Sequence, residues 1–444
     1  MTVYENVRVL HFSPGSVSEP VDVAVEGARI AEVGPGLAAK YPGAARESVG
    51  GYVSPGLVCS HNHFYSALSR GLMVALKPSK DFAQQLVNLW WRLDRALDPG
   101  IVRASGMAGA ADAIACGVTA VVDHHASPEF IDGSLDAIRE GFDATGLRGI
   151  LCYETTDRNG PDDAKAGVRE NVRFAGRVDA VRADAARGNG HEPLVEAAIG
   201  AHAPFTVGDD TMAVLAGACS STGRGLHIHV AEDKYDAVDS RYRFGLDIAE
   251  RMDRAGLLGP KTILGHGLWL TDSEVELVNA RDSFLAHNAR SNMNNAVGYN
   301  ERLPRYRNAV LGTDGIGSDM LAEACFAFFK HRDAGGPLWM DAFLRMLQDG
   351  NRLLERYFPG KRFGRVEAGY EADLTFWDYD PPTPLVGDNV AGHVAFGMSS
   401  RMVRSTMVAG QFAMKDRKPL FDAAAIARTG REETIRLWKR MEER

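Results

Sequence analysis

Short apolar runs alternate with helical stretches through the middle of this chain. The apolar runs that we interpret as strands end near His63, Asp123, Tyr153, His202, His229, His266, His287 and Asp314. Apolar residues three and four positions apart predict helices at 101–116, 134–145, 162–186, 209–222 and 244–255. Strands that alternate with helices predict a parallel sheet of the α/β class. Eight such units in this length predict a (β/α)8 TIM-like barrel.

The two ends of the chain show a different pattern, in which apolar and polar residues alternate. Residues 21–25 and 29–33 alternate on either side of Gly27, which predicts a hairpin. Strands are also expected at 372–377 and 403–411. A small sheet buries little core by itself, so we expect the two ends to form one small β-sandwich domain. The expected domains are 1–54 (first part of the β-sandwich), 55–365 (barrel) and 366–444 (second part, with a C-terminal helix).

Composition excludes several classes of protein. The 444 residues carry a net charge of −8, so nothing supports binding to nucleic acid. Residues 1–6 lack the basic region and apolar run of a secretory signal, and no apolar run approaches the roughly 20 residues of a membrane span. The five scattered cysteines do not suggest a disulfide framework. We therefore expect a cytoplasmic protein that binds neither nucleic acid nor a membrane.

Polar residues end several of the predicted strands, and the carboxyl ends of barrel strands are where active sites lie. The first strand ends in His61-Asn62-His63, and alternate strand residues share a face, so both imidazoles point the same way. His266 ends the sixth strand, and Asp314 ends the eighth. Imidazoles and a carboxylate that leave a coordination position open for water are typical of a catalytic metal site.

The fifth predicted strand, 226–230, offers two further imidazoles. His227 and His229 share a face, so the spacing alone leaves open which of them binds the metal, although Glu232 three residues later favours His229. A metal ion lowers the pKa of its bound water to about 7, which gives a nucleophile at neutral pH. Hydrolysis of a C–N bond also requires protonation of the leaving nitrogen, and Glu232 is placed for this role.

The segment 64–99 is long for a first βα loop. It carries Trp90 and Trp91, and such a loop usually forms a lid or a substrate wall. The alternative is that both indoles pack between helices. As wall residues, they could stack on a flat heterocycle.

Other polar residues belong to loops at the same predicted mouth. The expected substrate-binding residues there are Asp94, Trp91, His125, His202 and His287. His124 and His125 point to opposite faces of their strand, so only one of them should face the mouth. Glu154 is expected to contact either the ligand or Arg158.

These motifs together resemble those of a known family. They are Pro55-Gly56-Leu57 before His61-Asn62-His63, His229 with Glu232, Gly265-His266-Gly267, and Gly312-Thr313-Asp314-Gly315. With the split β domain, they resemble the amidohydrolase superfamily, and within it the branch of cytosine deaminase, guanine deaminase and the triazine hydrolases. The resemblance covers almost the whole chain.

The resemblance implies roles for individual residues. The implied metal ligands are His61, His63, His229 and Asp314, and the implied catalytic residues are Glu232 as proton shuttle, His266 beside the attacking water or substrate, and Asp314. His202 and Asp94 are implied to contact the substrate ring. Relatives with two metals carry a bridging lysine or a similar ligand after strand four, whereas residues 197–204 contain no lysine. One divalent ion is therefore expected, zinc, with iron as the alternative.

The expected activity is hydrolysis of a C–N bond in a small nitrogen heterocycle, such as a purine, a pyrimidine or a related cyclic amide. Metal-activated water would attack the ring, leading to deamination or ring opening. The alternatives are a triazine-type hydrolase that displaces chloride or an alkylamine, and a catalytically inactive structural homologue. Because all the implied ligands and Glu232 are present, we favour an enzyme. The apolar, Trp-rich first loop also predicts a homodimer.

Overall fold

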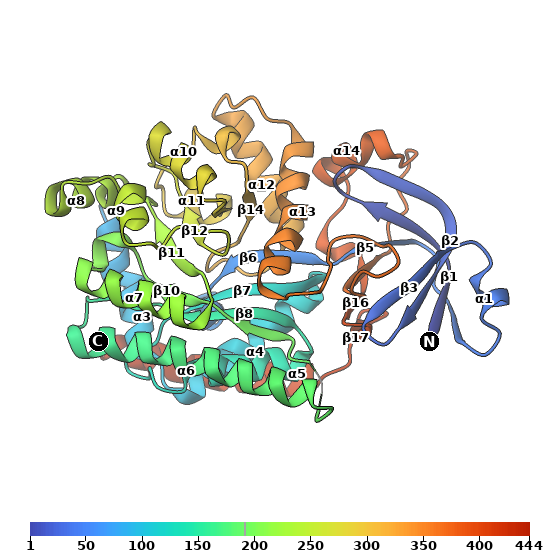
Figure 1. Ribbon diagram of the computed structural model, residues 1–444, viewed down its shortest axis with the longest axis horizontal. Helices are drawn as coiled ribbons and strands as arrows, with labels where there is room; N and C mark the ends of the chain where they lie inside the picture. Colours follow the sequence, from blue (N-terminus) through green and yellow to red (C-terminus); the bar gives the residue numbers. More distant parts are fainter. Residues whose placement is uncertain (191) are drawn as a thin grey trace.

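The computed structural model describes residues 1–190 and 192–444, and its centre is a barrel of parallel strands (Figure 1). The strands pair in the orders β6-β7-β8-β9 and β10-β11-β12-β13-β14. Parallel bridges from Asn62 to Asp314 and from Thr155 to Ala201 join the two sheets. The strands are β6 (Leu57–Asn62), β7 (Val118–His125), β8 (Arg148–Tyr153), β9 (Val195–Ala197), β10 (Ile199–Ala201), β11 (Leu226–Val230), β12 (Ile263–His266), β13 (Phe284–His287) and β14 (Ala309–Leu311).

The predicted (β/α)8 class is confirmed, with β9 and β10 as two halves of the fourth strand. Every residue of these strands is buried. Parallel strands covered on both faces read as continuous apolar runs rather than as an alternation, which is why they could be recognised from the sequence.

Helices surround the barrel. They are α4 (Pro99–Ala115), α5 (Ser134–Thr145), α6 (Pro161–Ala186), α7 (Asp209–Thr222), α8 (Lys234–Phe244), α9 (Ile248–Arg254), α10 (Asp272–Ala280), α11 (Ala289–Asn294), α12 (Met320–Asp333) and α13 (Met340–Tyr357). The helix predicted over 244–255 is present as α9, but its predicted start was wrong, and α8 was not predicted. Gly245 adopts a left-handed conformation (φ 67°), which ends α8, and α9 begins only at Ile248.

Strands from both chain ends form one nine-stranded sheet beside the barrel (Figure 1). They are β1 (Thr2–His11), β2 (Ser16–Glu26), β3 (Arg29–Gly34), β4 (Ala45–Ser48), β5 (Tyr52–Pro55), β15 (Leu374–Trp377), β16 (Val403–Val408), β17 (Gln411–Lys415) and β18 (Lys418–Pro419). β15 lies between β5 and β16, so Leu374 is opposite Pro55 on one side and Met407 on the other. This pairing joins the two ends of the chain, and the sheet has its own core, which includes Val7 and Phe376.

Shorter elements complete the chain. They are α1 (Leu37–Lys40), α2 (Phe82–Gln85), α3 (Trp91–Ala96), α14 (Val390–Phe396), the π-helical segment η2 (Leu86–Trp90) and the 3-10 segments η1 (Phe64–Ser69), η3 (Pro204–Thr206), η4 (Leu303–Arg305), η5 (Gly387–Asn389) and η6 (Ser400–Met402), followed by the long helix α15 (Ala423–Glu442). The C-terminal helix α15 leaves the sheet and packs along α4 of the barrel. It also contacts α3, where Arg440 Nε donates to the carbonyl of Ala96 and Arg92 Nε donates to the carbonyl of Met441, both at 2.6 Å. Among the described helices, none is long and apolar enough to cross a membrane.

Candidate active site

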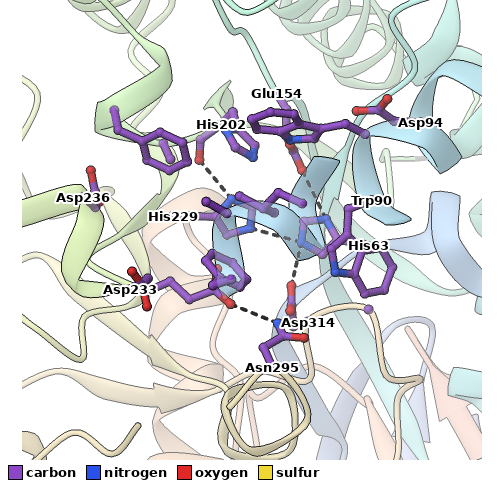
Figure 2. A pocket seen from close by; sticks show the side chains of 18 of the residues that line it. His63, Trp90, Asp94, Glu154, His202, His229, Asp233, Asp236, Asn295 and Asp314 are labelled. Carbon is purple, nitrogen blue, oxygen red and sulfur yellow. Dashed lines mark hydrogen bonds and ion pairs between the residues drawn. The ribbon is translucent and has the colours of Figure 1, made fainter. Parts of the chain in front are cut away.

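Four side chains from three barrel strands converge at the carboxyl end of the barrel, and Figure 2 shows three of them, His63, His229 and Asp314. His61 and His63 belong to the end of β6, His229 lies on β11, and Asp314 follows β14. Asp314 Oδ1 is 2.7 Å from His63 Nε2 and 3.3 Å from His61 Nε2. His63 Nε2 is 3.1 Å from His229 Nε2. Three imidazole nitrogens and one carboxylate oxygen therefore face a single point.

This donor set fits a divalent metal ion. Ligand atoms of His61, His63 and His229 lie within 4.8 Å of one another, as do those of His61, His229 and Asp314. His124 also lies within this distance of the first group, and His266 of the second. His61 Nε2 and His266 Nε2 are buried and have no hydrogen-bond partner in residues 1–190 and 192–444. Buried polar atoms are normally paired, and a cation would satisfy several of these at once. Nitrogen and oxygen ligands of this kind suit zinc, and imidazole also suits iron.

Backbone carbonyls orient two of the imidazoles. His63 Nδ1 donates to the carbonyl of His124 at 2.6 Å, and His229 Nδ1 donates to the carbonyl of His202 at 2.9 Å. A hydrogen bond at Nδ1 fixes the tautomer in which Nε2 carries a free lone pair. Both Nε2 atoms are thus prepared to bind a cation.

The structure also separates the two histidines of β11. His229 faces the convergent centre, whereas His227 lies behind His61, with its Nε2 atom 2.8 Å from His61 Nδ1. A strand places both side chains on the same face, and only the three-dimensional position of β6 makes one of them a neighbour of His63.

Burial and the ion pair between His63 and Asp314 set the pKa values at the centre. Burial alone would raise the pKa of Asp314, but His63 and His61 hold it well below its ordinary value. Burial likewise opposes protonation of His63, yet Asp314 and Glu154 raise its pKa to about 9. Without a cation His63 therefore also carries a proton on Nε2, toward Asp314, and a bound metal ion would displace that proton. Burial lowers the pKa of His61 to about 4. Asp314 is therefore a carboxylate, the form that binds metal.

Glu232 and His266 lie next to this centre. Asn295 Nδ2 donates to Glu232 Oε1 at 3.1 Å, and Glu232 Oε2 is 3.6 Å from His266 Nε2. His266 Nδ1 in turn donates to Asn292 Oδ1 at 2.8 Å. Burial raises the pKa of Glu232 to about 7, so its carboxyl group can both give and take a proton near neutral pH.

The backbone is unusual at the ends of the strands that carry these groups. Ala231, His266 and Asp314 adopt left-handed conformations, with φ of 47°, 72° and 52°. Such conformations are uncommon for residues other than glycine, and they occur often at functional sites. At Ala231 the surroundings support the turn, because its amide donates to Asp236 Oδ2 at 2.7 Å.

A cavity opens in front of these groups, and aromatic side chains form much of its wall (Figure 2). Residues that line it include Tyr65, Phe82, Trp90, Trp91, Asp94, Glu154, His202, Phe205, Glu232 and Asn295. Phe82, Trp90 and Trp91 come from the segment 64–99, so this segment lies along the cavity. Both indoles also pack against the apolar cluster of Phe82, Leu86, Leu268 and Val297, as in the alternative. Flat apolar walls with a few polar groups are typical of a site for a small ring compound.

Three of the expected substrate residues, Asp94, Trp91 and His202, line this cavity. Asp94 Oδ2 pairs with Arg158 Nη2 at 2.5 Å, and the Arg158 guanidinium lies 4.6 Å from the centre of a Trp91 ring. Burial raises the pKa of Asp94 to about 6, although Arg158 opposes this shift. His202 Nδ1 is 2.8 Å from Thr206 Oγ1, which fixes the orientation of its ring.

The other two expected substrate residues, His125 and His287, are not among the described residues that line the cavity. His125 is fully buried, and its Nε2 atom is 2.8 Å from Ser127 Oγ. Neighbouring strand residues point to opposite faces, and here His124 is the one that points inward, within 4.8 Å of His61. His125 and His287 thus lie outside the described lining of the cavity, and their contact with substrate stays a prediction.

Two side chains at the site, those of Glu154 and Asn295, were weakly indicated by the sequence or not indicated at all. Glu154 lines the cavity, and its Oε1 atom is 3.3 Å from both His63 Nδ1 and His124 Nδ1. Burial raises the pKa of Glu154 to about 8. Of the two alternatives for Glu154, the cavity is thus the one that the structure supports. Asn295 follows α11 in an ordinary polar stretch, and only the fold brings it to Glu232.

Comparison with known proteins gives a consistent result. Residues 52–413 match the sequence model of the amidohydrolase family. A 5′-deoxyadenosine deaminase of Methanopyrus kandleri is 27% identical over 82% of each chain. A 5-methylthioadenosine/S-adenosylhomocysteine deaminase of Thermococcus onnurineus is 28% identical over 89% of this chain and 90% of its own.

Solved structures share the fold. An adenosine deaminase from Xanthomonas campestris with bound zinc superposes with a TM-score of 0.83 at 24% identity, covering 99% of this chain and 98% of its own. An atrazine chlorohydrolase from Arthrobacter aurescens, complexed with zinc, superposes with a TM-score of 0.81 at 21% identity, over 98% and 100% of the two chains.

Proposed function

Because this chain belongs to the amidohydrolase family, we propose that it is a metal-dependent hydrolase that deaminates a nitrogen heterocycle such as a purine or a pyrimidine. The convergence of His61, His63, His229 and Asp314 beside Glu232, in a cavity with aromatic walls, carries this proposal. The curated relatives are named deaminases, which favours deamination over ring opening and over displacement of chloride or an alkylamine.

We propose that His61, His63, His229 and Asp314 hold one zinc ion, with iron as the alternative. Such an ion supplies Lewis acidity and lowers the pKa of water, so that hydrolysis proceeds near neutral pH. Residues 197–204, at the end of the fourth strand, contain no lysine that could bridge a second ion. Elemental analysis of purified protein should find about one divalent ion per chain, and a value near two would refute the mononuclear site.

The side chains around the centre have distinct roles in this proposal. Glu232 takes a proton from the attacking water and gives one to the leaving nitrogen, for which a pKa near 7 is suitable. His266, whose Nδ1 atom donates to Asn292, faces Glu232 through Nε2 and lies beside the carbon that water attacks. Trp91 and His202 hold the ring against the centre, with Asp94 and Glu154 as carboxyl groups for its polar edge.

The experiment is a screen of zinc-loaded protein against purines, pyrimidines, their 5′-deoxynucleosides, hydantoins and cyclic ureas. Ammonia release and a change in ring absorbance should appear together for at least one ring system. Ring opening without ammonia would replace deamination by the alternative chemistry. No turnover of any compound, by protein shown to contain metal, would favour an inactive homologue.

We also propose that the protein is a cytoplasmic homodimer. Trp90 and Trp91 face the cavity in this fold, so the first loop is a weaker candidate for the interface than its composition suggests. Phe329 and Phe396, on α12 and α14, are 47% and 78% exposed, and their ring centres lie 6.0 Å apart. An exposed aromatic pair suits an isologous contact. Light scattering that finds a 48.1 kDa monomer at micromolar concentration would refute the dimer.

A further inference from the structure

A chain of buried polar groups runs from His61 into the barrel interior. His227 Nε2 is 2.8 Å from His61 Nδ1, and His227 Nδ1 is 3.6 Å from Cys152 Sγ. Cys152 Sγ is 3.7 Å from the carbonyl oxygen of Asp123. All three side chains are completely buried.

His61 is thereby oriented differently from its two neighbours. The Nδ1 atoms of His63 and His229 donate to backbone carbonyls, whereas the partner of His61 Nδ1 is a second imidazole. Ligand histidines usually donate this hydrogen to a carboxylate, a carbonyl or water. An imidazole partner, unlike a carbonyl oxygen, can either donate or accept, because the facing nitrogen exists with or without a hydrogen.

The contacts allow only one direction of donation if His61 Nε2 is to bind a metal. The hydrogen of His61 must then be on Nδ1, so His227 Nε2 must accept it. Neutral His227 carries its own hydrogen on Nδ1, facing the Cys152 sulfur, and the thiol donates to the Asp123 carbonyl. In the opposite direction His227 would donate to His61, and the hydrogen of His61 would occupy the atom that faces Asp314.

We propose that His227 is a positioning residue that accepts the Nδ1 hydrogen of His61 and so holds His61 in its metal-binding tautomer. This inference rests on the proposed metal site. The ring of His227 has little freedom to turn away, because it stacks on His124 with 4.4 Å between ring centres and 29° between planes. His124 Nε2 also lies 3.2 Å from the His227 carbonyl, which fixes the stack.

The test compares His227→Gln with His227→Asn. A glutamine amide oxygen reaches the position of the imidazole Nε2 atom, whereas the asparagine amide ends one methylene short of it. The readouts are the zinc dissociation constant, from competition with a chromophoric chelator, and the absorption bands of the cobalt-loaded protein. We expect His227→Gln to stay within about threefold of the parent and His227→Asn to bind zinc about 10–100-fold more weakly with altered cobalt bands.

Equal zinc affinity of the two variants would overturn the proposal. If both bind like the parent, no acceptor is needed, and if both are equally weakened, the ring matters for packing instead. Imidazole 15N spectra of the zinc-loaded parent give a second test that needs no variant, since His227 should be protonated at Nδ1 only. Protonation at Nε2 would overturn the proposal. Failure of the parent to bind zinc would refute the metal site as well.

Discussion

Replacing Glu232 by glutamine separates proton transfer from metal binding. Glu232 accepts a hydrogen bond from Asn295 at Oε1 and lies 3.6 Å from His266 at Oε2. Glutamine keeps the side-chain length and can still accept from Asn295, but its amide cannot carry a proton between water and a leaving nitrogen. The substitution therefore removes one function and leaves the surrounding contacts available.

The contacts of Glu232 determine how much the substitution should change stability, and its role as proton carrier determines how much it should change turnover. His266 donates through Nδ1 to Asn292, so its Nε2 atom is an acceptor that a glutamine amide can face. No buried group loses its partner, and we expect a stability change below about 1 kcal/mol. General acid–base groups contribute about 10²–10⁴ in rate, so turnover should fall by at least 10²-fold, which corresponds to about 2.7 kcal/mol in activation free energy.

The assay measures turnover of the compound found in the screen, with zinc content and thermal midpoint measured on the same preparation. Glu232→Gln should retain about one ion per chain and the midpoint of the parent while losing activity. A Glu232→Gln protein that has lost its metal, or one that turns over within tenfold of the parent, would refute the proposed role.

Three further results are expected. Asp314→Asn should lose zinc by elemental analysis, because a neutral amide replaces the carboxylate that His63 and His61 keep ionised; full occupancy would exclude Asp314 as a ligand. Arg158→Met should lower stability by about 3–5 kcal/mol, because Asp94 is left buried without its cation, and the double variant with Asp94→Asn should recover most of this in thermal unfolding. His125 and His287, whose pKa values burial lowers to about 3, remain neutral in the fold but protonate in the unfolded chain below pH 6.5. Stability should therefore fall by about 2 kcal/mol per histidine between pH 7 and pH 5, and a His287→Gln variant whose thermal midpoint falls as far as that of the parent would contradict this.

The sequence alone determined the architecture, because the burial of each strand requires a particular pattern of apolar and polar residues. Strands covered on both faces must be apolar throughout, as in β8. In β2, Val23 and Val25 face the core of the sheet, and Ala24 on the other face is buried in a separate small cluster with Leu37. The helix ranges predicted from the sequence for α5 and α7 also agree with the structure. The start of α9 could not be predicted, because glycine at position 245 is compatible with both a helix interior and a left-handed turn, and tertiary packing decides between them.

At the site, the sequence determined which residue types end the strands, and the tertiary structure decided which of them meet. His227 and His229 are equivalent by spacing, and the position of β6 makes one a neighbour of His63 and the other a support for His61. Asn295 reaches Glu232 across 63 positions of sequence. Periodicity fixes the face on which a side chain lies, but the distances between faces of different strands follow from barrel closure, which no local pattern records.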